Sequence, residues 1–494
     1  MPKAKIVSPL LTLTTLVAVF LLLFLVMFVF PADGIKVGKY ELQFPTPNEF
    51  FGIENKSDSI ENYEKDLALL FDDSTMVKEK ISQIDSTIIK QKLDSLAAYR
   101  KKLQVTDKSI PALHRFFEAL ENAQKKKVRI MHYGDSQIEV DRITSYIRNE
   151  LQTKFGGIGV GLFPVVDIAP KMSVNISYSE NWQRYAGYGA KDSTITHQRY
   201  GPLISFSRFA PIPQTTFLDE LPDNEAWIKI NKPKASYGKT KQYTQLKIML
   251  SNMVTYVDYE IIVDGTVAKE GKLAPNSPFE VITTNFKSTP EEILINFKGK
   301  DSPDVYALSL EGNTGVVMDN IPLRGSSGTI FTKLDRTLMA NAFAHLSPDL
   351  IILQFGGNVM PYIKSEKECE DYGNWFKSQI NFIKRNNPKA AIMVIGPSDM
   401  SIKEKTTYVT YPMLEGVRDA LKDAALSTDC IFWDMYEVMG GKNSMPDWVN
   451  AEPPLAASDY THFTPKGAKK IAEEFYNKLT EMYVDYKLDE PLNP

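Results

Sequence analysis

Apolar positions are distributed unevenly along the chain, and the longest uninterrupted run lies close to its start. No charged residue occurs between Ile6 and Phe30, a stretch of 25 residues. A helix of about 20 apolar residues crosses the hydrocarbon core of a membrane, whereas the apolar core of a signal peptide usually has about 7 to 15 residues. We therefore expect residues 6–30 to form an uncleaved transmembrane helix, with a cleaved signal peptide as the alternative.

The charges beside this run indicate its orientation. Lys3 and Lys5 precede it, whereas Asp33 and Glu41 follow it together with a few lysines. Because positively charged flanks stay in the cytoplasm, residues 1–5 are predicted to be cytoplasmic. The chain is then expected to be a single-pass membrane protein whose other residues lie outside the cytoplasm, in the periplasm if the cell is Gram-negative.

Residues 31–108 are predicted to form a connector followed by a helical stalk. Up to residue 60 neither the period of a strand nor that of a helix is sustained. From Glu61 to Gln104 charged residues surround apolar ones that recur near helical spacing, such as Val77 and Ile81. This apolar stripe either packs the helix against its own domain or pairs two copies in a coiled coil, and the lack of clean heptads favours the first.

Two later parts of the chain alternate between strands and helices. The first contains an apolar strand at 128–133 and a helix with apolar residues at 140, 143, 147 and 151. Such alternation predicts a parallel sheet covered by helices, formed by residues 109–164 and 305–485 together. In the second part we expect strands at 349–355, 390–396 and 430–433, and helices at about 366–385, 413–425 and 465–483.

Residues 165–304, between these two parts, have the two-residue period of β-strands. Clear examples lie at 245–250, 259–264 and 292–297. The simplest organisation is one α/β domain interrupted by an inserted all-β domain that resembles a sandwich. Residues 486–494 are expected to be a C-terminal tail.

Composition narrows the classes of function. The chain of 494 residues has 57 Lys and Arg against 61 Asp and Glu, so it has no excess of positive charge with which to bind nucleic acid. Its two cysteines, Cys369 and Cys430, do not have the spacing of zinc or iron-sulfur ligands. A pair of cysteines is compatible with an oxidising exterior, but at this separation we favour two separate buried thiols, and we expect no metal site.

A serine follows the first predicted strand of the α/β domain, in the segment Gly134-Asp135-Ser136-Gln137. Ligands bind at the carboxyl edge of such sheets, and the start of a helix favours the negative charge that develops when a serine attacks. Ser136 is thus a candidate nucleophile, with a simple helix cap as the alternative. The neighbouring Asp135 is expected to brace the turn instead of serving the serine, since adjacent side chains on a tight turn point apart.

Asp459 and His462 lie on a loop that leads into the last predicted helix. An Asp three residues before a His can hold the imidazole in the tautomer that accepts a serine proton. Either this pair is catalytic or Asp459 only caps a turn, and the scarcity of histidine, with five in the chain, favours the first. The other histidines are expected to be structural: His114, His132, His197 and His345.

Two further segments could donate hydrogen bonds to an oxyanion. One contains Gly325 and Gly328 after a strand, and the other contains Gly356, Gly357 and Asn358 at a strand end. Glycine leaves backbone N–H groups accessible to a ligand, and Asn358 adds an amide donor. Each segment could equally be a plain glycine turn, but all four candidate segments fall at strand ends or helix entries of one sheet.

These four segments, in this order, resemble those of the SGNH hydrolase family, also called GDSL esterases. The resemblance covers roughly residues 109–164 and 305–485 and implies a flavodoxin-like three-layer fold with a parallel sheet of about five strands. It implies the following site: Ser136 as nucleophile, His462 as general base, Asp459 as its orienting acid, and the backbone N–H of Ser136 with Gly325 and Asn358 as the oxyanion hole. No metal or organic cofactor is implied.

The chain departs from the usual family pattern at two positions. Gln137 follows the serine where the family usually has Leu, and Val359 follows Asn358 where the family often has Asp or Glu. Neither change removes a catalytic group, but both put a simple lipase assignment in doubt. The long insertion is similar to that of members carrying a β-sandwich, and its aromatic residues are candidates for stacking on sugars or for an ordinary core: Trp182, Tyr185, Tyr188, Tyr200 and Trp227.

The resemblance and the predicted anchor together indicate a membrane-anchored serine esterase that acts outside the cytoplasm. Its expected substrate is an acylated carbohydrate polymer, most simply an O-acetylated surface polysaccharide or peptidoglycan. Two alternatives remain open: a polysaccharide O-acetyltransferase that works with a membrane acyl-donor protein, and an anchored carbohydrate-binding protein without activity.

Overall fold

The computed structural model describes residues 35–37, 40–42, 103–214, 217–233 and 235–489. The predicted transmembrane helix and residues 43–102 of the predicted connector and stalk lie outside these residues. Two compact units are distinguished, Met1–Leu70 and Phe71–Pro494, and the described part of the first is the antiparallel pair β1 (Ile35–Val37) and β2 (Tyr40–Leu42). Among the described residues, no helix has the length and apolar character needed to span a membrane.

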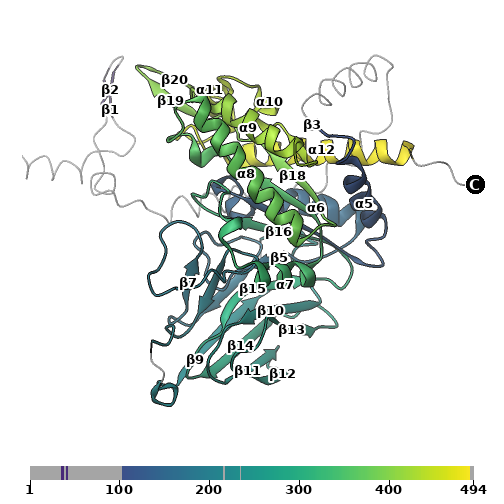
Figure 1. The fold of residues 1–494 in the computed structure, drawn as a ribbon, viewed down its shortest axis with the longest axis vertical. Coiled ribbons are helices and arrows are strands. Elements are labelled where there is room, and N and C mark those ends of the chain that lie inside the picture. Colours follow the sequence, from purple (N-terminus) through teal and green to yellow (C-terminus); the bar gives the residue numbers. More distant parts are fainter. Residues whose placement is uncertain (1–34, 38–39, 43–102, 215–216, 234, 490–494) are drawn as a thin grey trace, which may run out of the picture. The chain divides into compact units, whose positions relative to one another are not determined.

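A parallel sheet forms the centre of the α/β part of the second unit (Figure 1). Its strands run side by side in the order β16, β4, β17, β18 and β21, which is the flavodoxin-like order in which the first strand lies between the second and the third. The predicted α/β fold with about five parallel strands is therefore confirmed. The bounds are β4 (Lys127–Gly134), β16 (Gly315–Pro322), β17 (Pro348–Gln354), β18 (Ala391–Ile395) and β21 (Ile431–Trp433).

Helices cover both faces of this sheet. Successive side chains of each strand point to opposite faces, and because both sets are largely apolar, both faces must be buried. On the interior strand β4, Met131 and Tyr133 belong to one core cluster, whereas Val128 and Ile130 belong to another. The first cluster includes side chains of α7 (Arg336–Leu346), α8 (Glu366–Asn386) and α9 (Leu414–Leu426), and the second those of α5 (Ile110–Glu121), α6 (Thr144–Phe155) and α12 (Pro465–Asp489). Three layers result.

The prediction of a helical stalk up to Gln104 was wrong at its end. Leu103 and Gln104 form the short strand β3, which pairs antiparallel with β21 at the edge of the sheet. An edge strand exposes unpaired backbone N–H and C=O groups, so an extended segment beside it gains hydrogen bonds. The spacing of apolar residues does not show this gain. Four other short elements were not predicted either: the hairpin of β19 (Ser401–Glu404) and β20 (Thr407–Thr410), and the helices α10 (Met435–Met439) and α11 (Ser444–Val449).

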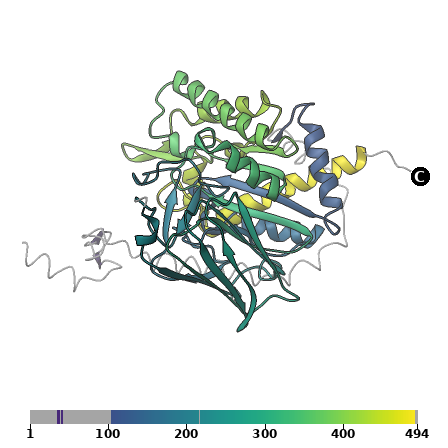
Figure 2. The same ribbon diagram turned by 60° about the horizontal axis from the view of Figure 1, so that its bottom comes forward.

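The inserted segment folds into two antiparallel sheets around a shared core (Figure 2). The first sheet has the order β13, β10, β15, β8, β7, with β5 also paired to β15, and the second has the order β12, β11, β14, β9, β6. The bounds are β5 (Gly161–Phe163), β6 (Asn175–Tyr178), β7 (Gln183–Ala186), β8 (Ser205–Arg208), β9 (Asn224–Asn231), β10 (Gln245–Ser251), β11 (Val257–Val263), β12 (Thr266–Leu273), β13 (Glu280–Asn285), β14 (Glu292–Gly299) and β15 (Asp304–Glu311).

The pairing of β5 with β15 places the junctions of the insertion a few residues outside the expected range 165–304. Leu308 lies opposite Phe163 and Leu310 opposite Gly161, so residues 161–163 and 304–311 belong to the first antiparallel sheet. The chain enters and leaves the insertion side by side, and backbone pairing between these two segments closes it. Local periodicity does not show this closure, because the pattern of a strand does not specify the strand with which it pairs.

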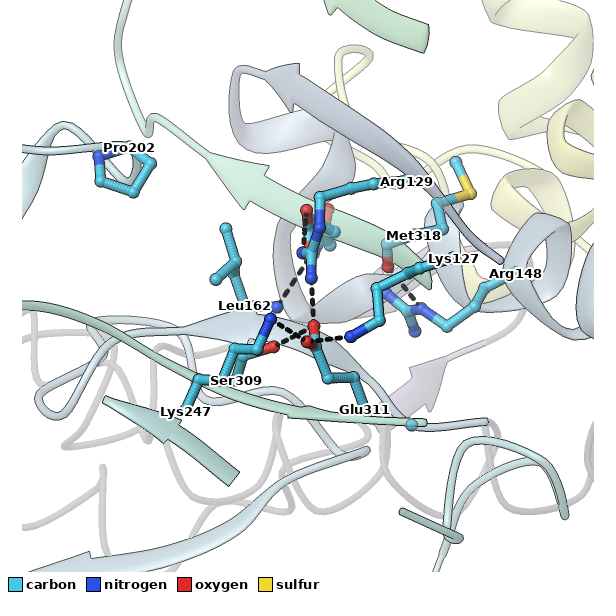
Figure 3. A network of polar contacts seen from close by, with 12 residues as sticks. Lys127, Arg129, Arg148, Leu162, Pro202, Lys247, Ser309, Glu311 and Met318 are labelled. Atoms are coloured by element: carbon cyan, nitrogen blue, oxygen red, sulfur yellow. Dashed lines mark hydrogen bonds and ion pairs between the residues drawn. The ribbon is translucent and has the colours of Figure 1, made fainter. Parts of the chain in front are cut away.

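A buried network of charges joins the insertion to the parallel sheet (Figure 3). Glu311 of β15 contacts Arg129 of β4, while Lys127 and Lys247 approach the same carboxylate to 2.5 and 2.8 Å. Arg129 also donates two hydrogen bonds to Asp319 of β16, at 2.7 and 2.8 Å. Burial alone would raise the pKa of Glu311, but Arg129 and the two lysines outweigh it and hold that pKa below its usual value. The network ties the parallel sheet to the first antiparallel sheet.

Candidate active site

Ser136 lies at the carboxyl end of β4, where the chain turns into the short 3₁₀-helix η1 (Ser136–Asp141). Asp135 caps this helix, because its Oδ1 accepts the backbone N–H of Gln137 at 3.0 Å. Asp135 thus braces the turn as expected, and burial raises its pKa to about 6. The amphipathic helix does not follow Ser136 directly: η1 is interrupted by non-helical backbone at Glu139 and Val140, and α6 begins only at Thr144.

Ser136, His462 and Asp459 form a continuous chain of hydrogen bonds. Ser136 Oγ lies 2.9 Å from His462 Nε2, and His462 Nδ1 lies 2.7 Å from Asp459 Oδ2. The other oxygen of Asp459 accepts the backbone N–H groups of Thr461 and His462, at 2.9 and 3.0 Å. Burial would raise the pKa of Asp459, but these bonds and the neighbouring imidazole lower it to about 2. Asp459 is therefore ionised at neutral pH and can orient His462.

A small pocket of about 80 Å³ opens beside Ser136 and His462. Asn358 lines it from η4 (Gly357–Val359), which follows β17. All of its lining residues belong to the α/β part of the chain: 135–137, 354–355, 357–358, 397–398, 400, 435 and 461–462. A pocket of this size accommodates a small acyl group more readily than a long acyl chain.

Gly325 is not among the residues that line this pocket. It lies on the turn after β16 with a φ of +75°, a backbone conformation that favours glycine. The next residue connects this turn to the pocket, because Asn358 Nδ2 donates to the carbonyl oxygen of Ser326 at 3.2 Å. The structure therefore brings Asn358 to Ser136 and His462, and places Gly325 on the adjacent turn.

An ion pair fastens that turn to the helix of the serine. Arg324 Nε and Nη2 donate to the two carboxylate oxygens of Glu139, at 2.5 and 2.8 Å. Glu139 is buried, whereas the Arg324 side chain is 53% exposed. A bidentate pair of this kind fixes orientation as well as distance. The turn that carries Gly325 is thus held against η1, a contact that the sequence did not indicate.

The sequence interpretation also missed Gln137 and Ser398 as site residues. Gln137 is buried in the wall of the pocket, and its amide donates to the carbonyl oxygen of Thr461 at 2.6 Å and to Ser398 Oγ at 3.3 Å. Ser398 follows the end of β18, so its position at a strand end was a usable signal. Gln137 could have been recognised because it replaces the Leu that usually follows the serine in the family.

None of the other four histidines and neither cysteine lines the pocket. His132 is fully buried on β4 between Thr144 Oγ1 and Gln354 Oε1, each at 3.0 Å, and burial lowers its pKa to about 4. Cys369 and Cys430 are free and buried, which confirms the prediction of two separate thiols. Within the part of the chain that the structure describes, no three His, Cys, Asp or Glu side chains gather so as to hold a metal ion.

A much larger groove, of about 790 Å³, lies on the insertion. It follows the outer face of the second antiparallel sheet, where Trp227 of β9 lies opposite Asn296 of β14 and Asn296 lies opposite Glu260 of β11. The indole of Trp227 is 38% exposed. Of the other aromatic residues considered for sugar stacking, Trp182, Tyr185 and Tyr200 are buried, and Tyr188 packs against the core.

Residues 282–470 match the model of the GDSL-like lipase/acylhydrolase family. This range contains Gly325, Asn358, Asp459 and His462, whereas Ser136 precedes it on the far side of the insertion in sequence. No curated protein has a sequence that matches the chain.

Solved structures similar to this one include several esterases. A peptidoglycan O-acetylesterase shares 19% identity with a TM-score of 0.59 over 78% of this chain and 99% of its own. A family two carbohydrate esterase from Clostridium thermocellum shares 10% identity with a TM-score of 0.23 over 62% of this chain and 99% of its own. A putative GDSL-like lipase from Bacteroides ovatus shares 12% identity with a TM-score of 0.25 over 63% and 98%. The first of these similarities establishes a common fold.

Proposed function

We propose that this chain, a member of the GDSL-like lipase/acylhydrolase (SGNH) family and hence an esterase, removes O-acetyl groups from a cell-surface carbohydrate polymer. The observation that carries the proposal is the hydrogen-bonded series Ser136, His462 and Asp459 beside a pocket of about 80 Å³. This series has the geometry of a nucleophile, its base and the orienting acid. The small pocket favours acetyl over larger acyl groups.

The proposed reaction begins with the attack of Ser136 Oγ on the ester carbonyl, while His462 Nε2 takes the hydroxyl proton. Asn358 lies in the same pocket and has a second amide N–H besides the one bonded to Ser326, so it can donate to the oxyanion together with the backbone N–H group of Ser136. His462 then protonates the departing sugar oxygen, which leaves acetyl-Ser136. A water molecule deprotonated by His462 releases acetate.

A carbohydrate polymer as substrate is supported by the groove on the insertion. A planar indole next to an amide and carboxylates can contact both the C–H face and the hydroxyls of a sugar. The charged residues of the groove include more carboxylates than lysines, so a neutral or amino-bearing glycan fits it better than a phosphorylated polymer: Glu225, Asp258, Glu260, Glu270, Lys272 and Lys298. A solved structure with the same fold is that of a peptidoglycan O-acetylesterase, so O-acetylated peptidoglycan is the first polymer to test.

Replacement of Trp227 by Ala is expected to weaken binding of the polymer and leave hydrolysis of a small acetyl ester unchanged. Loss of one stacked aromatic contact should raise the Kd by about tenfold, which corresponds to about 1.4 kcal/mol. The measurement is sedimentation with insoluble peptidoglycan. Trp375→Ala serves as the control, since Trp375 is 62% exposed on α8 and does not line the groove. Equal binding of the polymer by both variants would show that the groove does not bind it.

Product analysis tests the function as a whole. The full-length chain in detergent is incubated with O-acetylated peptidoglycan and, separately, with a soluble acetyl donor plus an unacetylated oligosaccharide. We expect free acetate from the polymer and no acetylated oligosaccharide. Acetylated oligosaccharide would instead support transfer, because water and a sugar hydroxyl can both resolve the same acyl-enzyme. Binding without any acetate release would support a purely carbohydrate-binding role.

The proposed location is outside the cytoplasm, with residues 6–30 as a membrane anchor. The support for it is the uncharged run of 25 residues preceded by Lys3 and Lys5. An anchored esterase would act on polymer close to the membrane surface. Protease treatment of intact spheroplasts tests this placement: we expect cleavage of the catalytic part from outside, and protection would contradict it.

A further inference from the structure

The residue after the nucleophile makes contacts on both sides of His462. Gln137 Nε2 donates to the carbonyl oxygen of Thr461 at 2.6 Å, and Gln137 Oε1 accepts the backbone N–H of Phe463 at 3.4 Å. Its own backbone N–H is held by Asp135 at 3.0 Å. One side chain therefore connects the turn that carries Ser136 to the main chain immediately before and immediately after the base.

Other contacts of the His462 loop approach it mainly from other directions. Tyr460 accepts the backbone N–H of Ser401 at 3.0 Å and stacks on Tyr408, so the hairpin β19–β20 supports the loop on the side of Asp459. Arg142, which follows η1, adds a longer hydrogen bond of 3.4 Å to the carbonyl oxygen of Phe463. The hairpin contacts hold the loop at Tyr460, and neither of them involves the turn that carries Ser136.

We propose that Gln137 is a positioning residue that sets the approach of His462 to Ser136. Only a side chain with both a donor and an acceptor can bond a carbonyl oxygen and an N–H group two residues apart, and a primary amide has both. Gln137 is 6% exposed, so water does not replace these bonds when the amide is lost. This inference rests on the proposed catalytic role of the serine and the histidine, and it concerns a residue whose amide is hydrogen-bonded to neither Ser136 Oγ nor the imidazole of His462.

The test compares two buried glutamines. Gln137→Met keeps the length of the side chain but removes the amide, and Gln152→Met does the same on α6, where Gln152 donates to the carbonyl oxygens of Gly159 and Val316 at 3.0 and 3.1 Å. A misplacement of about 1 Å in a catalytic group costs about 100-fold in rate. We therefore expect Gln137→Met to lower kcat for a small acetyl ester by about 100-fold with KM unchanged, and Gln152→Met to lower the Tm with kcat unchanged.

A second measurement reads the reactivity of Ser136 without any natural substrate. The rate of labelling by a fluorophosphonate should fall in Gln137→Met by the same factor as kcat. If Gln137→Met does not fold, Gln137→Glu replaces it, since a carboxylate keeps an acceptor for Phe463 but loses the donor for Thr461. The same loss of kcat at unchanged KM is then expected.

The outcomes separate this inference from the proposed function. If the unchanged protein is not labelled at Ser136, the serine mechanism itself fails. If the unchanged protein is labelled and the folded Gln137 variants have its kcat within twofold, the positioning role is overturned and the mechanism stands. A rise in KM that accounts for the whole loss would also overturn it, because it would place Gln137 in substrate binding.

Discussion

Ser136→Ala and His462→Ala are each expected to lower kcat/KM for acetyl ester hydrolysis by about 10³-fold or more. The first variant lacks the nucleophilic oxygen. The second lacks the imidazole, whose Nε2 lies 2.9 Å from Ser136 Oγ and accepts the hydroxyl proton. Because the two residues act as a unit, the double variant should be hardly worse than either single one. The measurement is steady-state hydrolysis by the full-length protein in detergent, with Ser398→Ala, a serine in the wall of the same pocket, as the comparison.

Asp459→Asn extends the same prediction. Its amide keeps an oxygen for the backbone N–H groups of Thr461 and His462 but loses the negative charge that favours the correct tautomer of His462. The expected loss of kcat/KM is large but smaller than that of Ser136→Ala. Activity in purified Ser136→Ala close to that of the unchanged protein would contradict the assignment of the nucleophile, whatever the other variants show.

Arg129→Met is expected to cause the largest loss of stability, about 3 to 5 kcal/mol in the free energy of unfolding. Arg129 is buried and contacts two buried carboxylates, those of Glu311 and Asp319. Without the guanidinium these carboxylates keep their charge in the interior with less compensation, and Asp319 also loses two hydrogen bonds. Since the network joins β4, β15 and β16, the insertion and the parallel sheet should loosen together.

Urea unfolding followed by tryptophan fluorescence measures this loss. The matched control is Lys232→Met, which removes one cation from an ion pair with Glu291 at 2.9 Å, where both side chains are exposed. Exposed pairs contribute about 0 to 1 kcal/mol, so the control should unfold almost as the unchanged protein does. An equal midpoint for Arg129→Met and Lys232→Met would show that the buried network does not hold the two parts together.

The pH dependence of this network has a defined sign. The pKa of Glu311 is held below its usual value in the folded protein, so its contribution to stability is complete above the ordinary pKa of a glutamate. The contribution is lost as the pH falls below that value and approaches the lowered pKa. The difference in stability between the unchanged protein and Arg129→Met should accordingly shrink in strong acid.

The sequence by itself located the long strands and helices of the α/β part, but not the short elements β3, β19, β20, α10 and α11. Burial is encoded locally: a strand such as β17 is an apolar run, and a helix such as α8 has an apolar stripe, so the pattern located both within a few residues. The same local reasoning found Ser136 at a strand end and the pair Asp459 and His462 on one loop. The predicted membrane helix lies outside the described residues and remains a prediction.

Only the tertiary structure decided which distant segments meet. Ser136 and His462 are 326 positions apart in the sequence. Segments that no local period relates are also joined by the hydrogen bond from Gln137 to Thr461, by the pairing of β5 with β15 and by the pairing of β3 with β21. The bond between Arg324 and Glu139 is of the same kind. Hydrogen bonds and ion pairs depend on positions within about 3 Å, which are set when the whole chain packs. A period of 2 or 3.6 residues specifies which face of an element is buried, but not its partner.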